Sequence, residues 1–252
     1  MLTSQRKALL LARLKQDGQL LAKTLSQELE LSEDTIRRDL RELAREGKLQ
    51  RVHGGALPAS DAVADLATRE RIAPADKQAL GRAGAALIKP GQLVILDGGT
   101  TALQLAAQLP PDLRATFVTH SPTVAIELAK HAHVEVIMLG GRLFRHSMVN
   151  MGAAMLEAAA HLRADLYFMG VTGVHREAGL STGDFEEAAV KRALHARAAE
   201  TIVLASSEKL GAASAFEIAP LTALAALVLP PLTAAATVKS FQVKGLKVLL
   251  AG

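Results

Sequence analysis

The chain has 252 residues, half of them apolar and 21% charged, which is the composition of a globular protein of one large domain or two ordinary ones. It contains no cysteine, so disulfide bonds, a thiol nucleophile and cysteine-ligated zinc are excluded. Six Phe and one Tyr are its only aromatic residues, which argues against a single-strand binder that stacks bases on aromatic rings. The histidines show no metal-ligand spacing, and we expect neither a metal nor a cofactor.

Two segments bear on location. The first residues lack the uninterrupted apolar run and small-residue cleavage site of a signal peptide. Residues 218–238 carry no charge and are long enough to span a bilayer, but three prolines and three threonines interrupt them. A buried strand between proline turns explains this segment better. We therefore expect a cytoplasmic, nucleoid-associated protein with no membrane partner.

The positive charge of the chain is uneven. The formal net charge is +4, and residues 1–57 hold eleven Lys and Arg against eight Asp and Glu. Five of those cations lie between Arg37 and Lys48, a clustering typical of nucleic-acid binding. The stretch Leu57–Asp61 has the composition of a loop. We expect a DNA-binding domain over 1–57, a linker over 58–75 and a second domain over 76–252.

The first 57 residues predict a helix-turn-helix. Apolar residues recur at helical spacing over 4–16, 21–29 and 33–46. Ser32 is a good N-cap for the third helix and Gly47 a natural stop. Residues 48–55 alternate and end in two glycines, which predicts a small hairpin, or wing. Two short helices, a tight turn and a capped third helix make the pattern.

Polar residues at the start of the third helix are the expected base readers, because a recognition helix inserts its N-terminal half into the major groove. Arginine pairs with a guanine edge, and threonine meets a thymine methyl or a phosphate. The expected DNA-binding residues are Ser32, Thr35, Arg37, Arg38 and Arg41 from this helix, with Arg51, His53, Gly54 and Gly55 from the wing.

A purely structural alternative exists for the charged residues of this helix. The arginines over 37–45 could form a solvated face paired with Asp34, Asp39 and Glu42 at helical spacing. The cap, the preceding helix, the turn and the wing in register favour DNA binding instead. We expect Asp39 to be structural, holding Arg37 or Arg38 or orienting the helix.

These residues resemble a known family. The segment Ser32-x-x-Thr35-Ile36-Arg37-Arg38-Asp39-Leu40, preceded by Arg6 and followed by Arg51-x-His53-Gly54-Gly55-Ala56, is similar to the signature of DeoR-type transcriptional regulators. The resemblance implies a winged-helix DNA-binding domain and a double-stranded DNA operator as partner.

The rest of the chain predicts an α/β fold. Seven short apolar segments alternate with helical patterns, at 93–96, 116–118, 134–139, 166–169, 201–205, 225–229 and 248–251. Such alternation indicates a mainly parallel sheet with helices on both faces. We expect a small winged helix-turn-helix domain followed by a larger α/β domain.

The turn after the first of these strands is the sharpest feature. Asp97-Gly98-Gly99-Thr100-Thr101 joins a buried strand to a helix. Backbone N–H groups of such a turn, together with a helix N-terminus and two hydroxyl groups, can hold a phosphate. An ordinary strand-to-helix turn with a Thr cap explains the loop equally well in isolation. It is not a Walker loop, because no Gly-Lys-Thr follows.

Later strand ends supply further candidates, because open α/β sheets bind ligands there. They are Thr119, Ser121, Gly140, Gly141, Asp184, Glu187, Lys191 and Lys209. Carboxylates suit sugar hydroxyls and lysine suits a phosphate. The bland alternatives are a helix N-cap for Asp184 and a surface ion pair between Glu187 and Lys191.

These segments also resemble the effector domain of the DeoR family, which is similar to sugar-phosphate isomerases of the ribose-5-phosphate type. The resemblance implies that a small phosphorylated sugar binds there and changes DNA affinity. It places the phosphate at Asp97–Thr101 and the sugar near Asp184, Glu187, Lys191 and Lys209. The chain departs from the family with His120 in place of Asn, Ser206 in place of Asp, and Leu229-Pro230-Pro231-Leu232 in a late segment.

We expect a transcriptional regulator without enzymatic activity, a repressor whose operator affinity depends on that effector. We expect it to be a homo-oligomer, because half-sites on DNA call for symmetric pairing of the DNA-binding modules. The alternative is a sugar-phosphate isomerase with a nucleic-acid-binding extension. Asp97, Asp184, Glu187 and Lys191 include the chemistry for moving a proton beside a carbonyl.

Overall fold

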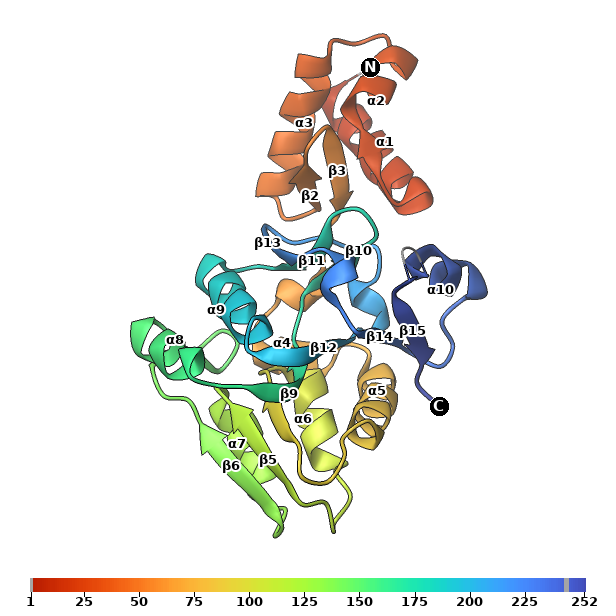
Figure 1. Ribbon diagram of the computed structural model, residues 1–252. Helices are drawn as coiled ribbons and strands as arrows, with labels where there is room; N and C mark the ends of the chain where they lie inside the picture. Colours follow the sequence, from red (N-terminus) through yellow and green to blue (C-terminus); the bar gives the residue numbers. More distant parts are fainter. Residues whose placement is uncertain (1, 243–244) are drawn as a thin grey trace.

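The computed structural model describes residues 2–242 and 245–252. The N-terminal module stands at the top of Figure 1, joined to the larger domain through its last strand. Its elements are α1 (Thr3–Asp17), β1 (Leu20–Leu21), α2 (Ala22–Glu28), α3 (Glu33–Arg45), β2 (Leu49–Val52) and β3 (Gly55–Pro58). The three strands pair antiparallel in the order β1-β3-β2, so β2 and β3 form the predicted wing.

Local signals account for these boundaries. The Ser32 side chain accepts a hydrogen bond from the Thr35 N–H at 3.2 Å and caps α3, as predicted. Gly18 ends α1 in the left-handed conformation. Gly55 has no room for a side chain, because a Cβ there would lie 1.7 Å from the Leu20 carbonyl oxygen of β1. The close approach of β3 to β1 therefore requires glycine at this position.

A buried ion pair ties α1 to α3. Arg6 donates two hydrogen bonds to the Asp39 carboxylate, one from Nε and one from Nη2 at 3.1 Å. Asp39 is fully buried, and its hydrogen bond raises the pKa of Arg6. The expectation that Asp39 holds Arg37 or Arg38 is therefore wrong: its partner is Arg6, across the core of the module.

The segment expected as a linker folds against the larger domain. It contains a short 3-10 helix, η1 (Asp61–Val63), and α4 (Leu66–Glu70). The Pro58 carbonyl accepts a hydrogen bond from Ala213 N–H at 3.2 Å, and Ser60 donates its hydroxyl to the Thr172 carbonyl. Leu66 is buried. We call residues 59–73 the connector; it is ordered structure packed on the second domain.

One seven-stranded parallel sheet forms the larger domain, in the order β15-β14-β12-β9-β4-β5-β6. The strands are β4 (Leu93–Leu96), β5 (Ala115–Thr119), β6 (Val134–Met138), β9 (Ala164–Met169), β12 (Ala198–Leu204), β14 (Ala226–Leu229) and β15 (Lys247–Leu250). All seven predicted strands belong to it, which confirms the α/β fold with a small winged helix domain.

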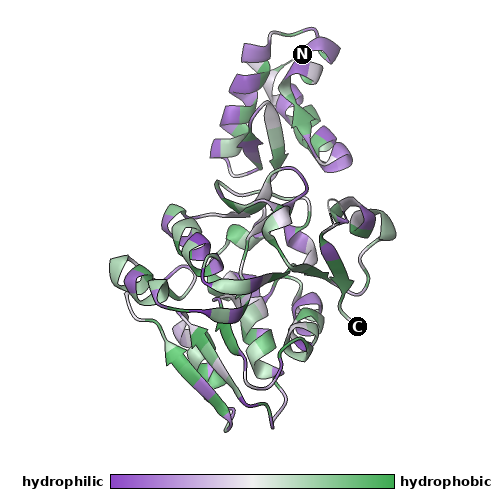
Figure 2. Cartoon of the chain, viewed as in Figure 1, coloured by the Kyte–Doolittle hydropathy of each residue, from purple (hydrophilic) through white to green (hydrophobic). Residues whose placement is uncertain are grey.

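Side chains alternate between two cores, one on each face of the sheet. Val94 and Leu96 enter one core and Ile95 the other, as the period of a strand requires. The first core contains residues of α5 (Pro74–Ala86), α6 (Thr100–Ala107) and α7 (Pro122–Leu128), and the second contains residues of α8 (Ala153–Ala160), α9 (Phe185–His195) and α10 (Ala235–Phe241). Figure 2 shows the strands mostly hydrophobic and the helices of the N-terminal module largely hydrophilic.

Shorter elements complete the domain. A hairpin pairs β7 (Arg142–Phe144) with β8 (Val149–Met151). A three-stranded sheet pairs β10 (Gly173–His175), β11 (Gly179–Thr182) and β13 (Phe216–Ala219), and 3-10 turns η2 (Ser207–Lys209) and η3 (Leu221–Ala223) follow β12 and β13. The uncharged residues 218–238 fall in β13, η3, β14 and α10. Within the described ranges, none of the helices has the length and apolar character needed to cross a membrane.

We predict that Arg6→Met lowers the free energy of unfolding of the N-terminal module by about 3 kcal/mol, because it leaves the Asp39 carboxylate buried without a partner. Hydrogen–deuterium exchange of α1 and α3 peptides measures this locally. Arg6→Met with Asp39→Leu should recover most of the loss. The control is Arg13→Met, an exposed residue of α1 with surface ion pairs, expected to change stability by less than about 1 kcal/mol. Equal protection in Arg6→Met and Arg13→Met would contradict the prediction.

Candidate functional site

The polar residues of α3 lie on the surface of the module. Arg38 and Arg41 are exposed. Arg37, also exposed, pairs with Glu33 one turn earlier at 2.8 Å. The Ser32 and Thr35 hydroxyl groups lie 2.9 Å apart at the start of the helix. The alternative of a paired basic face named other partners; only the Arg37–Glu33 pair resembles it, and Arg38 and Arg41 are exposed.

The wing presents a different mixture. Arg51 and His53 are exposed on β2 and in the turn. Gly54 occupies the turn with φ +79°, which favours glycine. Gly55 is buried and packs against Leu20, so its role is to fit the wing onto β1 rather than to touch a partner.

The pocket of the larger domain lies where the strand order reverses. From β4 the chain proceeds outward through β5 and β6, then returns to the other side of β4 with β9 and continues through β12. Loops that leave β4 and β9 therefore diverge and open a crevice at the carboxyl ends of the strands. Gly98–Thr101 after β4 and Gly170–Thr172 after β9 line the cavity found there.

Asp97, the last residue before the turn, is fully buried beneath this cavity. Five donors converge on its carboxylate at 2.7–2.8 Å: the N–H groups of Gly98 and Gly170, His120 Nε2, the Tyr167 hydroxyl and Lys191 Nζ. A carboxylate has about four lone-pair sites, so the protein uses all of them. His120 also contacts the Asn150 carbonyl oxygen through Nδ1 at 2.9 Å. The ring therefore bridges the Asp97 carboxylate and the backbone of β8.

Electrostatics keep Asp97 ionised. Burial alone would raise the pKa of Asp97, but the charge of Lys191 and the hydrogen bond from His120 outweigh it and hold the pKa well below its usual range. Burial and the same carboxylate raise the pKa of Tyr167. Asp97 was expected to touch a ligand; in the structure it lies outside the cavity lining, and its carboxylate accepts hydrogen bonds from the Gly98 N–H and Lys191 Nζ.

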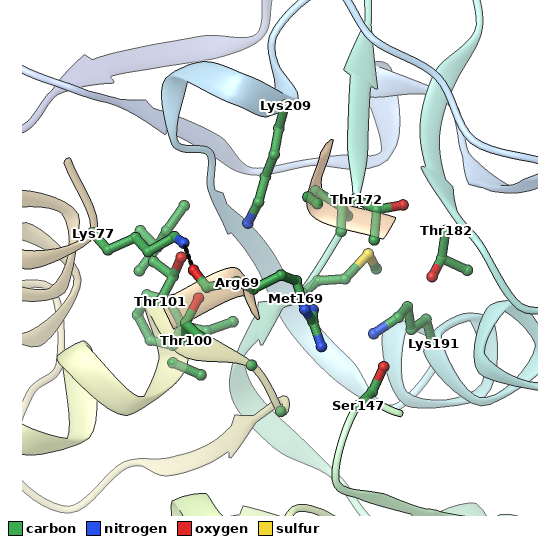
Figure 3. Close-up of a pocket in the computed structure, with 18 of the residues that line it drawn as sticks. Arg69, Lys77, Thr100, Thr101, Ser147, Met169, Thr172, Thr182, Lys191 and Lys209 are labelled. Atoms are coloured by element: carbon green, nitrogen blue, oxygen red, sulfur yellow. Dashed lines mark hydrogen bonds between the residues drawn. The ribbon is translucent and has the colours of Figure 1, made fainter. Parts of the chain in front are cut away.

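Four cationic side chains line the cavity: Arg69 of α4, Lys77 of α5, Lys191 of α9 and Lys209 of η2. Figure 3 shows Arg69, Lys191 and Lys209 pointing into the same space. Among the residues that the structure describes, the buried side-chain atoms without a hydrogen-bond partner are Arg69 Nε and Nη2, Thr101 Oγ1 and one oxygen of Glu208, and all of them belong to this lining. Buried polar groups in native proteins usually have partners, so this lining offers unused hydrogen-bonding capacity to a polar molecule.

Burial lowers the pKa of three of the cations in the lining. Burial, with the charges of Lys77 and Arg69 and against the carboxylate of Glu208, lowers the pKa of Lys209 to about 8. Desolvation also lowers the pKa of Arg69 and of Lys77. An anion in the cavity would reverse these shifts, because an opposite charge favours the charged form.

The sequence-predicted ligand residues divide into two groups. Those that line the cavity are Gly98, Gly99, Thr100, Thr101, Glu187, Lys191 and Lys209. Those outside the lining are Asp97, Thr119, Ser121, Gly140, Gly141 and Asp184. Thr119 is the buried last residue of β5 and Ser121 the buried N-cap of α7, whereas Gly140 and Gly141 are exposed beyond the edge strand β6. Asp184 caps α9 by accepting a hydrogen bond from the Glu187 N–H at 2.9 Å, as the N-cap alternative for this residue predicted.

Sequence reasoning missed Arg69, Lys77, Ser147 and Glu208 of the lining, and it did not single out Thr172 and Thr182 within the strand-end segments 170–173 and 179–182. Thr182, at the end of β11, donates to the Glu187 carboxylate at 3.3 Å. Arg69 and Lys77 sit in or beside the connector, away from any strand end. The sequence carries no motif around them that would have identified them.

A winged helix with exposed arginines, joined to an α/β domain with an unsatisfied cationic cavity, defines the class of DNA-binding transcriptional regulators with a sensor domain. Residues 6–61 match the family model of the DeoR-like helix-turn-helix domain, and residues 72–229 match that of the DeoR C terminal sensor domain. The chain belongs to the DeoR family of DNA-binding regulators, which confirms the resemblance drawn from its signature.

Relatives of similar length agree with this assignment. The HTH-type transcriptional regulator GolR of Listeria innocua is 32% identical over 240 residues, 94% of each chain. GlpR of Haloferax volcanii, also an HTH-type transcriptional regulator, is 34% identical over 200 residues, 79% of this chain and 78% of the relative. The HTH-type transcriptional repressor GlcR of Bacillus subtilis is 30% identical over 217 residues, 85% of this chain and 83% of the relative.

Solved structures resemble the chain only loosely. The full-length sorbitol operon regulator SorC of Klebsiella pneumoniae has a TM-score of 0.39 at 13% identity, over 82% of this chain and 91% of that one. A ribose 5-phosphate isomerase of Methanocaldococcus jannaschii has a TM-score of 0.41 at 16% identity over 54% of each chain. Likenesses of this strength carry no argument about function.

Proposed function

We propose that the chain is a transcriptional repressor that binds a double-stranded operator as a homo-oligomer and responds to a small phosphorylated sugar. Symmetric half-sites require at least two winged modules, which supports the oligomer. The repressor assignment is supported by the name of the relative GlcR. Exposed Arg38 and Arg41 on α3, with Arg51 on the wing, are the side chains that reach the DNA.

The unsatisfied cavity carries the proposal for the effector. Unpartnered donors from Arg69 and Thr101 lie in the lining with Lys77, Lys191 and Lys209, and two carboxylates, Glu187 and Glu208, accompany them. A phosphate monoester supplies close to two negative charges and three acceptor oxygens at pH 7. The carboxylates and threonines of the lining suit the hydroxyl groups of a sugar. One cavity therefore offers cations for a phosphate group and polar side chains for sugar hydroxyl groups.

The isomerase alternative loses two of its four groups, because Asp97 and Asp184 lie outside the cavity lining. Asp97, a candidate for moving a proton, has no exposed surface and no free lone pair. Glu187 and Glu208 remain as carboxylates in the lining. An isomerase assay on the purified chain with pentose and hexose phosphates, run beside the operator titrations, tests the alternative directly: turnover would support it.

Arg38→Ala and Arg41→Ala should each weaken operator binding by about 1–3 kcal/mol, the loss expected when an arginine that reads a base edge is removed. The operator is a fragment selected from random-sequence DNA, and the affinity is measured by fluorescence anisotropy. Arg82→Ala removes the same charge from an exposed position of α5 and serves as control. Affinities equal to the parent in folded Arg38→Ala and Arg41→Ala would remove α3 from the interface.

Gly99→Val should abolish the response to effector and leave effector-free operator affinity unchanged. Gly99 has φ +115°, a conformation almost confined to glycine, and its Cβ would point toward Arg69 Nη1 at 3.8 Å. The side chain would enter the space where the phosphate approaches the backbone. The measurement is operator affinity with and without a panel of sugar phosphates; the parent should change by about 5–150-fold.

Gly91→Val is the matched control for this variant. Gly91 also has positive φ, at +83°, has open space around it, and lies before β4 at the opposite end from the turn. It should unfold more easily but respond to effector normally. A folded Gly99→Val protein that responds like the parent would place the phosphate elsewhere.

Effector affinity should be steady between pH 7 and 8 and fall above pH 8, by at most about tenfold per pH unit. The second pKa of a phosphate monoester is about 6, so the ligand keeps its charge over this range. Lys209, with a pKa of about 8, loses its proton from the empty cavity as the pH rises. Lys209→Arg stays protonated and should hold the affinity steady to pH 9.5. Calorimetric titration over this range checks it, and a flat profile in the parent would contradict the role of Lys209.

A further inference from the structure

We propose that Arg69, carried by the connector between the two domains, binds the phosphate of the effector, and that this contact transmits occupancy of the cavity to the winged module. The inference rests on the proposed function of the cavity. Arg69 falls between the two matched regions, 6–61 and 72–229, so neither family model contains it.

The position of Arg69 fits an anion ligand. The Cβ position built on Gly99 lies 3.8 Å from Arg69 Nη1, so the guanidinium group lies above the Gly98–Thr101 turn. Its Nε and Nη2 atoms are buried and have no acceptor in the protein. The planar fork of an arginine matches two oxygens of a phosphate, and α6 begins at Thr100 in this turn, so its N-terminus also favours an anion. An anion between them would satisfy both.

The cavity itself holds the connector segment around Arg69 in place. Lys77 Nζ donates hydrogen bonds to the carbonyl oxygens of Arg69 and Ile72, each at 2.5 Å. Leu66 N–H donates to the His146 carbonyl at 3.0 Å. Until a ligand arrives, these contacts hold an arginine in a position where its charge is unpaired and partly desolvated. Such an arrangement is costly, so the docked connector gains stability when an anion binds.

The other end of the connector continues into the wing. Ser60 donates to the carbonyl of Thr172, a residue of the cavity lining, and Thr172 Oγ1 lies 2.7 Å from the Ser214 hydroxyl. Pro58, the last residue of β3, accepts from Ala213. A docked connector therefore fixes the base of the wing against the sensor domain within two residues of a cavity contact.

The docked state also sets the sign of the response. Arg51 and His53 of the wing line a groove together with Glu177 and Glu217 of the sensor domain. Acidic side chains beside the wing compete with DNA phosphates for its positive charge. A ligand acts only through its different affinities for two states, so an anion that binds better to the docked connector favours the state with weaker DNA binding. Effector should therefore release the operator.

Three full-length variants test the inference. Arg69→Met should weaken binding of inorganic phosphate by about tenfold or more, the loss expected for a hydrogen bond to a charged group. Arg69→Lys keeps the charge and should bind between parent and Arg69→Met. Arg71→Met removes an exposed arginine two residues along the connector and should bind phosphate like the parent. Calorimetry measures phosphate affinity, and a melting curve checks folding.

Ser60→Ala separates binding from transmission. It removes the hydroxyl that reaches Thr172 but no residue of the cavity lining. It should bind phosphate within about twofold of the parent, while a sugar phosphate that shifts operator affinity of the parent shifts that of the variant less. The full response in Ser60→Ala would overturn transmission through the connector.

Two results separate this inference from the proposed function. If Lys209→Met loses phosphate binding while folded Arg69→Met binds like the parent, the cavity is the effector site and Arg69 is not its ligand. If the parent binds neither phosphate nor any sugar phosphate, the proposed function fails, and this inference fails with it.

Discussion

A single buried carboxylate organises the larger domain. Asp97 directly follows β4, and its five donors come from the turn after it, from β9 and the loop after β9, from the loop after β5, and from α9. A buried charge is tolerated only when it is paired and fully hydrogen-bonded, so these four parts of the chain can take only one arrangement around it. The turn that faces the cavity and the direction of Lys191 both follow from it.

The cavity lining above Asp97 contains buried polar atoms that have no hydrogen-bond partner. Arg69 and Thr101 have buried donors without acceptors, and Lys209 holds its proton less firmly than a free lysine. The Asp97 carboxylate is fully hydrogen-bonded within the protein, whereas the lining above it keeps buried polar atoms without partners. Lys191 belongs to both, because its ammonium group binds the Asp97 carboxylate and its side chain also lines the cavity.

Strand periodicity and helix caps were sufficient to predict every strand of the seven-stranded sheet, the capped recognition helix and the wing. The turn at Gly98–Thr101 was also predicted, because glycines and hydroxyls after a buried strand are a local signal. Strand order is not local. Without the strand order, Thr119 and Gly141 look as suitable for ligand binding as Thr101. The order places β5 and β6 to one side of β4, away from the crevice between β4 and β9. Arg69 was missed for the same reason, because only the fold brings the connector over the turn.

The connector has a consequence for how such regulators can be recombined. Residues 59–73 belong physically to the sensor domain, since they pack on it and supply part of its cavity lining. A chimera that joins this sensor to a foreign DNA-binding module should therefore cross over between Pro58 and Ala59. A crossover near residue 75, at the start of α5, would give the hybrid a foreign connector and leave the sensor without its arginine.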